Sequence, residues 1–271
     1  MAMATTLFVG GGNMARAIIG GLLQQGQAPT SIVVIEPHEA TRLALQQDLG
    51  VTAHADSASL TEPVDVVVWA VKPQVLKPVM QALAVQLHSA LHLSIAAGVT
   101  TAAMQQWLGS SRVVRAMPNT PALIGKGIAG LFANADVNQA DRTAAAAVLQ
   151  AVGEVLWVEA EAQLDAVTAL SGSGPAYVFY FLEAMQQAGQ QLGLSAQQAY
   201  QLAVATFEGA SALAARSEET PEVLRQRVTS KGGTTYAATT TLDQLDVKAH
   251  FIAAMQACHD RAAEMAQEFG N

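Results

Sequence analysis

Short runs of consecutive apolar residues alternate with longer segments of helical periodicity over about the first 160 residues. Runs rich in Val, Ile and Leu predict strands that are buried on both faces. The predicted strands cover residues 5–9, 32–35, 66–70, 91–95, 112–116, 128–133 and 155–158, and the helices between the first of them cover 13–25, 39–49 and 73–87. Alternation of this kind predicts a doubly wound, Rossmann-like α/β domain built on a parallel sheet.

The strand pattern stops after about residue 161 and helical periodicity continues to the end. Helices are predicted over residues 163–170, 176–192, 196–215 and 247–269, with another short one opening at Pro221. The chain is therefore predicted to hold a dinucleotide-binding domain over residues 1–160 and an all-helical domain over residues 161–271. The helices are Ala-rich and apolar on more than one face, which predicts packing against a second subunit.

Composition narrows the class of protein. Hydrophobic residues make up 51% of the chain and charged residues 13%, which excludes a disordered protein. The net charge is −8 and no basic run occurs, so nucleic acid is not an expected partner. No leader sequence and no membrane-spanning stretch is recognised, and Cys258 is the one cysteine. We therefore expect a cytoplasmic protein without disulfides, and the six histidines show no metal-ligand spacing.

A glycine-rich turn over residues 10–15 reads Gly-Gly-Gly-Asn-Met-Ala and matches the pattern G-x-G-x-x-A. The turn lies between the first predicted strand and the first predicted helix, as dinucleotide binding requires. Gly10 permits the tight turn, Gly12 lets the backbone approach a pyrophosphate, and Ala15 allows close packing of helix and strand. The alternative interpretation is a tight turn without a ligand.

Glu36 stands at the end of the second predicted strand, directly after residues 32–35. A carboxylate at this place usually binds the ribose 2′-hydroxyl and repels a 2′-phosphate, which favours NAD over NADP. Arg42, about one helical turn further, could offset that repulsion. The alternative interpretation is that Glu36 caps the helix over residues 39–49.

Three further motifs follow predicted strands and would meet at the carboxyl edge of the sheet. They are Ala-Val-Lys-Pro over 70–73, Ser-Ile-Ala-Ala-Gly over 94–98 and Arg-Ala-Met-Pro-Asn-Thr-Pro-Ala over 115–122. The helical region adds Ser-Gly-Ser-Gly-Pro-Ala-Tyr over 171–177 and Val-Thr-Ser-Lys-Gly-Gly-Thr-Thr over 228–235. In order and spacing, the five motifs together closely resemble pyrroline-5-carboxylate reductase, the enzyme family of the last step of proline synthesis.

The resemblance implies an oxidoreductase that reduces the C=N bond of 1-pyrroline-5-carboxylate to give L-proline. The implied cofactor is NADP(H), with NAD(H) an alternative because of Glu36. The cofactor-binding residues expected from the turn and the motifs are Gly10, Gly12, Asn13, Met14, Glu36, Ser57, Ala70, Val71, Lys72, Pro73, Ala97, Asn119 and Pro121. The implied substrate-binding residues are Ser230, Gly232, Gly233, Thr234 and Thr235.

The chemistry of the substrate explains a pocket built from hydroxyls and amides. A cyclic imine is basic enough to be largely protonated near neutral pH, so no strong general acid is required. We expect Thr235 to be the catalytic residue, with its hydroxyl bound to the ring nitrogen. Ser230 and the amides of Gly233 and Thr234 are expected to bind the carboxylate. By local chemistry alone, these hydroxyls could instead cap a helix.

The resemblance also implies assembly. In this family the helical domains of two subunits interlock, and the pocket forms where one subunit's helical domain meets its partner's cofactor domain. Larger rings of dimers also occur. Two positions depart from the family pattern: Lys231 replaces the usual proline, and Ser57 replaces an asparagine found near the adenosine ribose in many members.

Two other classes of protein share parts of this pattern. A β-hydroxyacid dehydrogenase would carry a catalytic lysine in the stretch over residues 171–177, and that stretch has none. A non-catalytic dinucleotide sensor would keep the glycine turn but would not need the Ser-x-Gly-Gly-Thr-Thr segment over 230–235. Lys72 could also be an ordinary surface lysine ahead of a proline that starts a helix.

Overall fold

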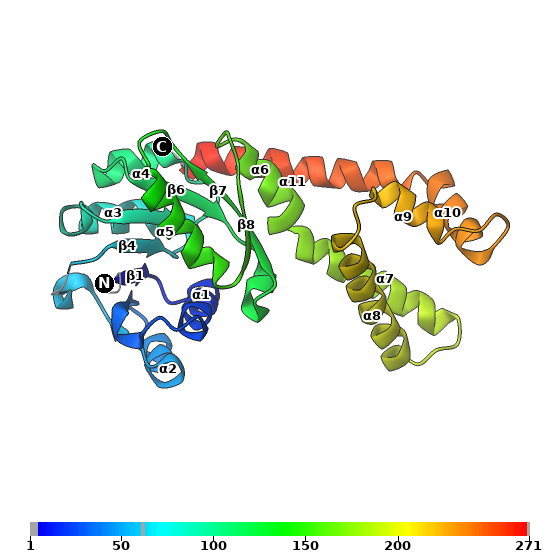
Figure 1. Cartoon of the computed structure of the whole chain (residues 1–271), viewed down its shortest axis with the longest axis horizontal. Helices are drawn as coiled ribbons and strands as arrows, with labels where there is room; N and C mark the ends of the chain where they lie inside the picture. The colour runs from blue at the N-terminus through cyan, green and yellow to red at the C-terminus, as the bar shows by residue number, and fades with distance from the viewer. Residues whose placement is uncertain (1–4, 61–62, 270–271) are drawn as a thin grey trace. The chain divides into compact units, whose positions relative to one another are not determined.

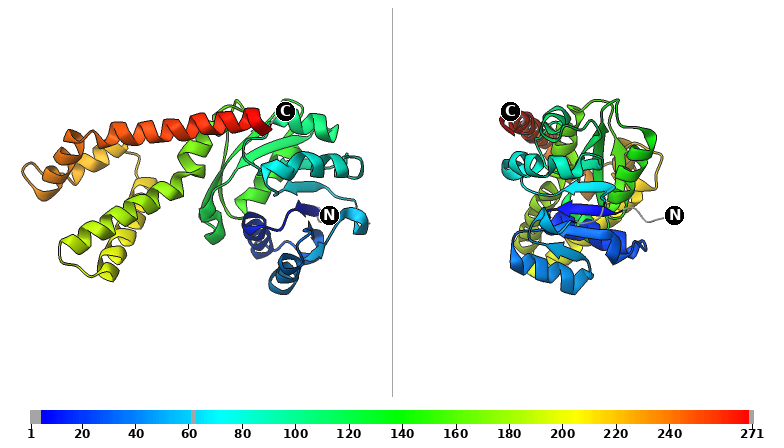
Figure 2. Two further views of the ribbon diagram at one scale, coloured as in Figure 1. Left: turned by 180° about the vertical axis from the view of Figure 1, so that it is seen from behind. Right: turned by 90° about the vertical axis from the view of Figure 1, so that its left-hand side faces the viewer.

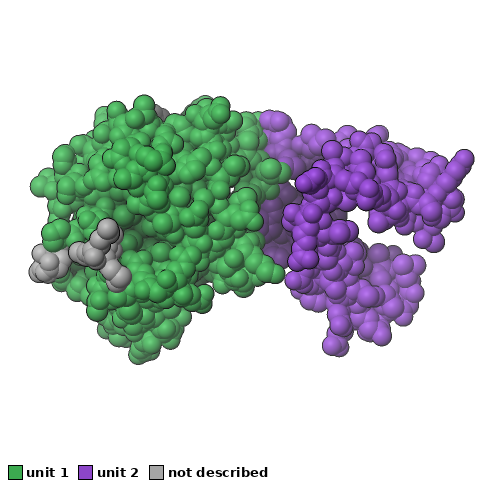
Figure 3. Space-filling view, viewed as in Figure 1, with its two compact units in different colours: residues 1–173, 258–271 green, residues 174–257 purple. Residues whose placement is uncertain are grey.

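The computed structural model describes residues 5–60 and 63–269. The chain divides into two compact units, Met1–Ser173 with Cys258–Asn271, and Gly174–Ala257 (Figure 3). These units divide the chain at other positions than the two domains predicted from the sequence. Residues 161–173 and the last part of the C-terminal helix belong to the unit that holds the sheet.

The first unit is built around one sheet, whose order is β3-β2-β1-β4-β5-β6-β7-β8 in the residues that the structure describes. The strands are β1 (Thr6–Val9), β2 (Ile32–Ile35), β3 (Thr52–His54), β4 (Val66–Trp69), β5 (Leu91–Ser94), β6 (Val113–Met117), β7 (Gly127–Ala133) and β8 (Gly153–Trp157). Strands β1 to β6 are all parallel and follow the order 3-2-1-4-5-6 of dinucleotide-binding folds. The predicted fold class is therefore confirmed.

The sheet departs from the prediction at two places. Strand β7 runs antiparallel to β6, because residues 118–126 are too few for the crossover that parallel neighbours need. Strand β8 then pairs parallel with β7. Strand β3 was not predicted, since it has three residues and buries one apolar side chain, Ala53.

Helices cover both faces of the sheet (Figures 1 and 2). They are α1 (Asn13–Gln24), α2 (Glu39–Leu49), α3 (Pro73–Leu87), α4 (Thr101–Leu108) and α5 (Gln139–Gln150), with short 3₁₀ turns η1 (Pro29–Ser31), η2 (Ser57–Ser59) and η3 (Thr120–Ile124). Alternate residues of one strand enter separate apolar cores: Phe8 packs with α1 and α5, and Leu7 with α3 and α4. Two buried layers explain why β2 and β4 are apolar without interruption.

The remaining elements are helical. They are α6 (Gln163–Val167), the π-helical turn η4 (Thr168–Gly172), α7 (Gly174–Gln191), α8 (Ala196–Ala215), α9 (Pro221–Arg227), α10 (Thr234–Gln244) and α11 (Val247–Phe269). A capping box of Ser195 and Gln198 opens α8, and Gly189 lets α7 and α8 approach closely at Ala199. Within the described residues, no helix combines the length and the apolar composition needed to cross a membrane.

The second unit has almost no apolar core of its own. All of its residues are described, and the apolar side chains buried in it belong to Leu182, Ala199 and Ala203. Large apolar side chains are instead exposed on its helices, including Tyr180 at 70% and Ile252 at 60% exposure. Exposed apolar surface of this kind marks an interface with another chain.

Candidate functional site: a dinucleotide edge and a substrate turn

The predicted cofactor residues of the sheet unit lie along one edge. Glu36, Gly10, Ala70 and Asn119 follow β2, β1, β4 and β6 within two residues, and Ala97 follows β5. These five strands are neighbours in the sheet and parallel, so their carboxyl ends form a continuous row. At about 4.8 Å between strands, the row is roughly 19 Å long. Ser57 follows the outermost strand, β3, and opens η2.

The backbone at position 10 favours glycine strongly, because of its conformation and its close neighbours. Its φ is 100°, and a Cβ atom would lie 2.7 Å from the carbonyl oxygen of Ala70. The Gly10 amide donates to the Ile35 carbonyl at 2.8 Å, and the Ala70 amide donates to the Val9 carbonyl at 2.8 Å. The turn is therefore held against both neighbouring strands.

Gly12 stands in a different situation. Its φ of −67° and ψ of −178° suit any residue, and no described atom lies within 4 Å of a Cβ built there. Gly12 is the N-cap of α1, and no described side chain caps that helix end. The first amides of α1, at Asn13 and Met14, thus open onto clear space, as an approaching pyrophosphate requires. The residues present fit a dinucleotide at this turn.

Glu36 connects the glycine turn to the start of α2. One carboxylate oxygen accepts from the Gly11 amide at 2.9 Å and the other accepts from the His38 amide at 2.9 Å. Arg42 donates from Nη1 to the carbonyls of Glu36, at 2.9 Å, and Pro37, at 2.6 Å. Both side chains are therefore engaged with the backbone that forms this end of the row.

The other predicted cofactor residues differ in their exposure and contacts at the carboxyl edge of the sheet. Lys72 is exposed at the N-cap position of α3, and Pro73 is the first residue of that helix. Asn119 is buried and uses its amide within the unit: Nδ2 donates to the Ser171 carbonyl at 3.1 Å, and Oδ1 accepts from the Ile128 amide at 3.0 Å. Both polar atoms of the Asn119 side chain therefore hold the backbone after β6 in place.

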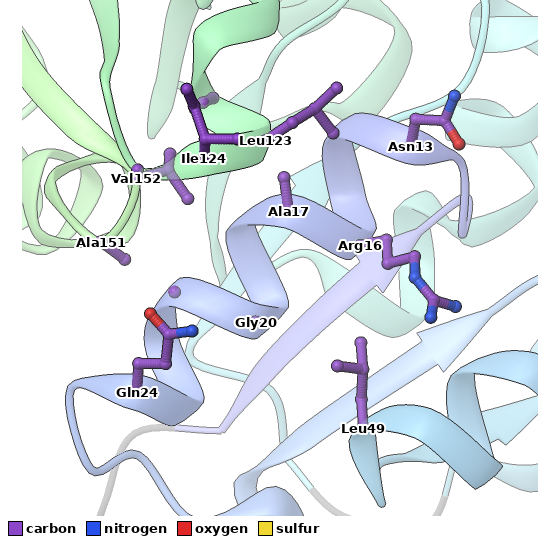
Figure 4. Close-up of a pocket in the computed structure, with 13 residues that line it drawn as sticks. Asn13, Arg16, Ala17, Gly20, Gln24, Leu49, Leu123, Ile124, Ala151 and Val152 are labelled. Atoms are coloured by element: carbon purple, nitrogen blue, oxygen red, sulfur yellow. The ribbon is translucent and has the colours of Figure 1, made fainter.

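A cavity of about 630 Å³ lies beside the row rather than along it (Figure 4). It runs along α1 from Asn13 to Gln24, is bordered by Leu49, Leu123 and Ile124, and opens to solvent. Of the predicted cofactor residues only Asn13 lines it, so this cavity does not coincide with the predicted dinucleotide site.

The predicted substrate residues form a turn that leads into α10 in the second unit. The Gly233 amide donates to the Ser230 carbonyl at 3.0 Å, and Gly232 has a φ of 75°. This combination is typical of a type II turn, which requires glycine at its third position and favours proline at its second, occupied here by Lys231.

The helix end after this turn is open. Gly233 is the N-cap of α10, and no side chain in the described residues caps the helix. A Cβ at Gly233 would lie 2.5 Å from Ser230 Oγ, so the Ser230 hydroxyl lies beside the first amides of α10. Thr235 is exposed, and no hydrogen bond among the described residues uses its hydroxyl. In the structure, therefore, the hydroxyls of Ser230, Thr234 and Thr235 do not cap α10.

A buried polar cluster near the edge was not predicted from the sequence. Arg115 of β6 is 5% exposed and lies 3.2 Å from Glu161, which also binds Thr101 at the start of α4. Arg115 stands in one of the strand-end motifs, but nothing local pairs it with a residue 46 positions away. Within the described part of the chain, no group of three or more His, Cys, Asp or Glu residues is placed to hold a metal ion.

The sheet order, the open glycine turn and the carboxylate after β2 define a dinucleotide-binding oxidoreductase with a separate helical region. Two family models match: "NADP oxidoreductase coenzyme F420-dependent" over residues 5–98, and "Pyrroline-5-carboxylate reductase dimerisation" over residues 161–265. The pyrroline-5-carboxylate reductase of Pseudomonas aeruginosa is 45% identical over 265 residues, 97% of each chain. The chain belongs to the pyrroline-5-carboxylate reductase family, as its motifs predict.

Solved structures agree. A pyrroline-5-carboxylate reductase from Coxiella burnetii matches with a TM-score of 0.91 and 41% identity, over 97% of this chain and 98% of that one. The Plasmodium falciparum enzyme, solved with NADP bound, matches with a TM-score of 0.87 and 26% identity, over 98% of this chain and 99% of that one. The dimerisation match and the exposed apolar side chains of the second unit support a homodimer.

Proposed function

We propose that this chain catalyses the NAD(P)H-dependent reduction of 1-pyrroline-5-carboxylate to L-proline. The observation that carries the proposal is the turn over residues 230–233, which leaves a serine hydroxyl and the uncapped amides of α10 exposed together. An uncapped helix N-terminus favours an anion such as a carboxylate. The relatives that match over nearly the whole chain are named for this reaction.

The cofactor would bind along the row of strand ends. The glycine turn and the amides of Asn13 and Met14 would hold the pyrophosphate, and Glu36 and Ser57 would face the adenosine end. Residues 70–73 would line the middle, with Ala97, Asn119 and Pro121 at the nicotinamide end. When bound, the reduced nicotinamide supplies a hydride to the C=N carbon.

The substrate residues would orient the imine. The Ser230 hydroxyl and the amides of Gly233 and Thr234 would bind the carboxylate, and the Thr235 hydroxyl would bind the ring nitrogen. The nitrogen keeps the proton it already carries as an iminium ion, while the carbon gains the hydride. The contribution of the protein would then be chiefly alignment of the two reacting atoms.

The choice of cofactor rests on opposing observations. The NADP-bound Plasmodium falciparum relative and the NADP oxidoreductase match support NADP(H). The Glu36 carboxylate would repel a 2′-phosphate, and Arg42 is engaged with the carbonyls of Glu36 and Pro37. We assign NADP(H) as the cofactor, with NAD(H) as the alternative.

Assembly would complete the site. In the proposed dimer, the helical domain of one subunit meets the cofactor domain of its partner, and the substrate turn enters that junction. The proposal includes the further assembly of such dimers into a larger ring. Molar mass measured by light scattering decides between a dimer and a ring.

Initial-rate kinetics test the reaction directly. Purified protein should oxidise NADPH or NADH with 1-pyrroline-5-carboxylate and should not act on β-hydroxy acids. Thr235→Ala should lower kcat by about tenfold to a hundredfold, because the hydroxyl oxygen that accepts from the iminium N–H and orients the ring is lost. Thr235→Ser should restore most of the activity.

Thr241→Ala is the matched control, because Thr241 lies later in α10 and its hydroxyl only returns to the Ala237 carbonyl at 3.0 Å. Its kcat should equal that of the wild type. Cofactor binding without imine reduction in the wild type would favour a dinucleotide sensor instead.

A further inference from the structure

Glu161 caps a helix that it does not belong to. Its carboxylate accepts from the Thr101 amide at 2.8 Å and from the Thr101 hydroxyl at 2.7 Å. Thr101 is the first residue of α4 and is 4% exposed. A carboxylate at this end of a helix satisfies a free amide and interacts favourably with the helix dipole.

The carboxylate is held in place by a buried cation. Arg115 Nη1 lies 3.2 Å from Glu161, and Arg115 Nη2 lies 3.8 Å from Asp165. Arg115 projects from the central part of β6, and Asp165 is buried in α6. The cluster thus joins three elements of the first unit: strand β6, helix α6 and the N-terminus of α4.

The segment that this clamp holds is the β5–α4 loop, residues 95–100. The loop starts where the Ile95 amide donates to the Trp69 carbonyl at 3.1 Å, and it ends at Thr101. In its middle, Gly98 has a φ of 73°, and a Cβ there would lie 3.1 Å from the Met265 side chain of α11. The loop carries Ala97, at the end of the row where the nicotinamide would lie.

We propose that Glu161 is a positioning residue for the dinucleotide: through Thr101 it sets the β5–α4 loop at the cofactor edge. This rests on the proposed function only in that a nicotinamide dinucleotide occupies the edge. Glu161 itself does not touch the cofactor. Its loss should therefore weaken dinucleotide binding and leave the substrate turn in the other unit unaffected.

The sheet offers a matched control at its opposite edge. Arg112 precedes β6 and donates to Asp141 at 3.0 Å from Nε and at 2.6 Å from Nη2. Asp141 is buried, as Thr101 is, and lies in the first turn of α5. Arg112 and Asp141 also form an arginine–carboxylate pair, with Arg112 more exposed than Arg115, and they lie at the amino end of β6, away from the cofactor row.

The test compares Glu161→Gln and Glu161→Ala with Asp141→Asn in the full-length protein. The dissociation constant of NADPH is measured by nicotinamide fluorescence, the Tm by calorimetry, and amide exchange over residues 95–104 by mass spectrometry. Glu161→Ala should raise the Kd of NADPH about tenfold, because a displaced loop misaligns the cofactor. It should also speed exchange over 95–104.

Glu161→Gln keeps the shape and one acceptor, so its Kd should fall between those of the wild type and the alanine variant. If the alanine variant does not fold, the glutamine variant alone tests the expected rise of the Kd. Asp141→Asn should lower the Tm but leave the Kd within about twofold of the wild type. The KM for the imine at saturating NADPH should not change in any variant.

An unchanged Kd in both folded Glu161 variants would overturn the proposal. An equal rise of the Kd in Asp141→Asn would also overturn it, because the effect would then be general destabilisation. Wild-type protein that binds NADPH but does not reduce the imine would remove the proposed function without affecting this result.

Discussion

Gly10 lies so close to Ala70 that a Cβ atom would be 2.7 Å from the Ala70 carbonyl oxygen, whereas Gly12 faces open space. The two glycines should therefore respond differently to the same substitution. Gly10→Ala forces φ = 100° on an alanine and pushes a methyl group into backbone, which should destabilise the fold by about 1–3 kcal/mol or more. Gly12→Ala should change the free energy of unfolding by less than about 1 kcal/mol.

Gly12→Ala should still weaken NADPH binding by at least about tenfold, since its methyl group fills the space that a pyrophosphate would enter. Urea unfolding and fluorescence titration measure the two quantities separately. A folded Gly12→Ala protein with wild-type affinity would mean that the dinucleotide does not lie on this turn.

Lys231 occupies the second position of a type II turn, where proline fits best. Lys231→Pro should raise the free energy of unfolding by about 0.4–1 kcal/mol, because the ring restricts the unfolded chain. It should also lower the KM for the imine by holding the substrate turn in one shape. Lys231→Ala removes the same side chain without the ring and should show neither effect. A lower Tm in the proline variant would contradict the turn assignment.

Glu36 should set the preference between the two cofactors. If the adenosine ribose lies beside Glu36 as proposed, Glu36→Gln removes a negative charge there and should raise the ratio of kcat/KM for NADPH to that for NADH about tenfold, or about 1.4 kcal/mol. Affinity for both cofactors should fall somewhat, because the carboxylate also accepts from the Gly11 and His38 amides. Glu154→Gln, an exposed change on β8, controls for net charge. An unchanged ratio would separate Glu36 from cofactor choice.

His92 should make stability depend on pH. It is fully buried, its Nδ1 accepts from Trp69 Nε1 at 3.3 Å, and its Nε2 has no hydrogen-bond partner among the described residues. Burial, reinforced by Arg112 and then His88, lowers the pKa of His92 from 6.5 to about 4. The unfolded chain therefore binds a proton that the folded protein excludes between these two pKa values.

The His92 contribution to stability should be complete above pH 6.5 and fall as the pH is lowered toward 4, by roughly 3 kcal/mol in total. Asparagine at this position can accept from Trp69 but does not titrate. Denaturant unfolding from pH 4 to 7 should therefore show a shallower decline for His92→Asn than for the wild type. Parallel curves would show that the pKa of His92 is the same in the folded protein as in the unfolded chain.

Tyr180 and Ile252 should report on the dimer. Both are more than half exposed in a unit that buries few apolar side chains. Tyr180→Glu and Ile252→Glu should each shift the molar mass in light scattering toward that of the 28.2 kDa chain. Val85→Glu is the control: Val85 is 95% exposed on α3, in the sheet unit, and its loss should not change the assembly. Wild-type mass in both helical-unit variants would place the interface elsewhere.

The apolar runs and the glycine turn made much of the fold predictable. The apolar runs that became β2 and β4 are uninterrupted, because both of their faces are buried, and this pattern can be recognised from the residues alone. The turn at Gly10 and the strand-end motifs can likewise be recognised from residues that are adjacent in the sequence. The same local signals led to the family, and the relatives confirm it. The individual site residues stay predictions.

Other features required residues that are far apart in the chain. The antiparallel direction of β7 follows from a short connection and its pairing with β6, not from the apolar pattern of either strand. Helices α4, α5 and α10 were not delimited from the sequence, since their moderate amphipathicity becomes decisive only when they pack. Asn119 shows no local sign that it binds the Ser171 carbonyl 52 residues later.

The sequence by itself therefore determined the class of the sheet, the place of the glycine turn and the family, because these depend on the period of buried positions and on backbone geometry over a few residues. The tertiary structure decided which glycine of the turn is required by the fold, what Glu36 binds, and the clamp from Glu161 to Thr101. These features depend on contacts between segments up to 60 residues apart in the chain. Such contacts form only when the apolar cores on both faces of the sheet have packed.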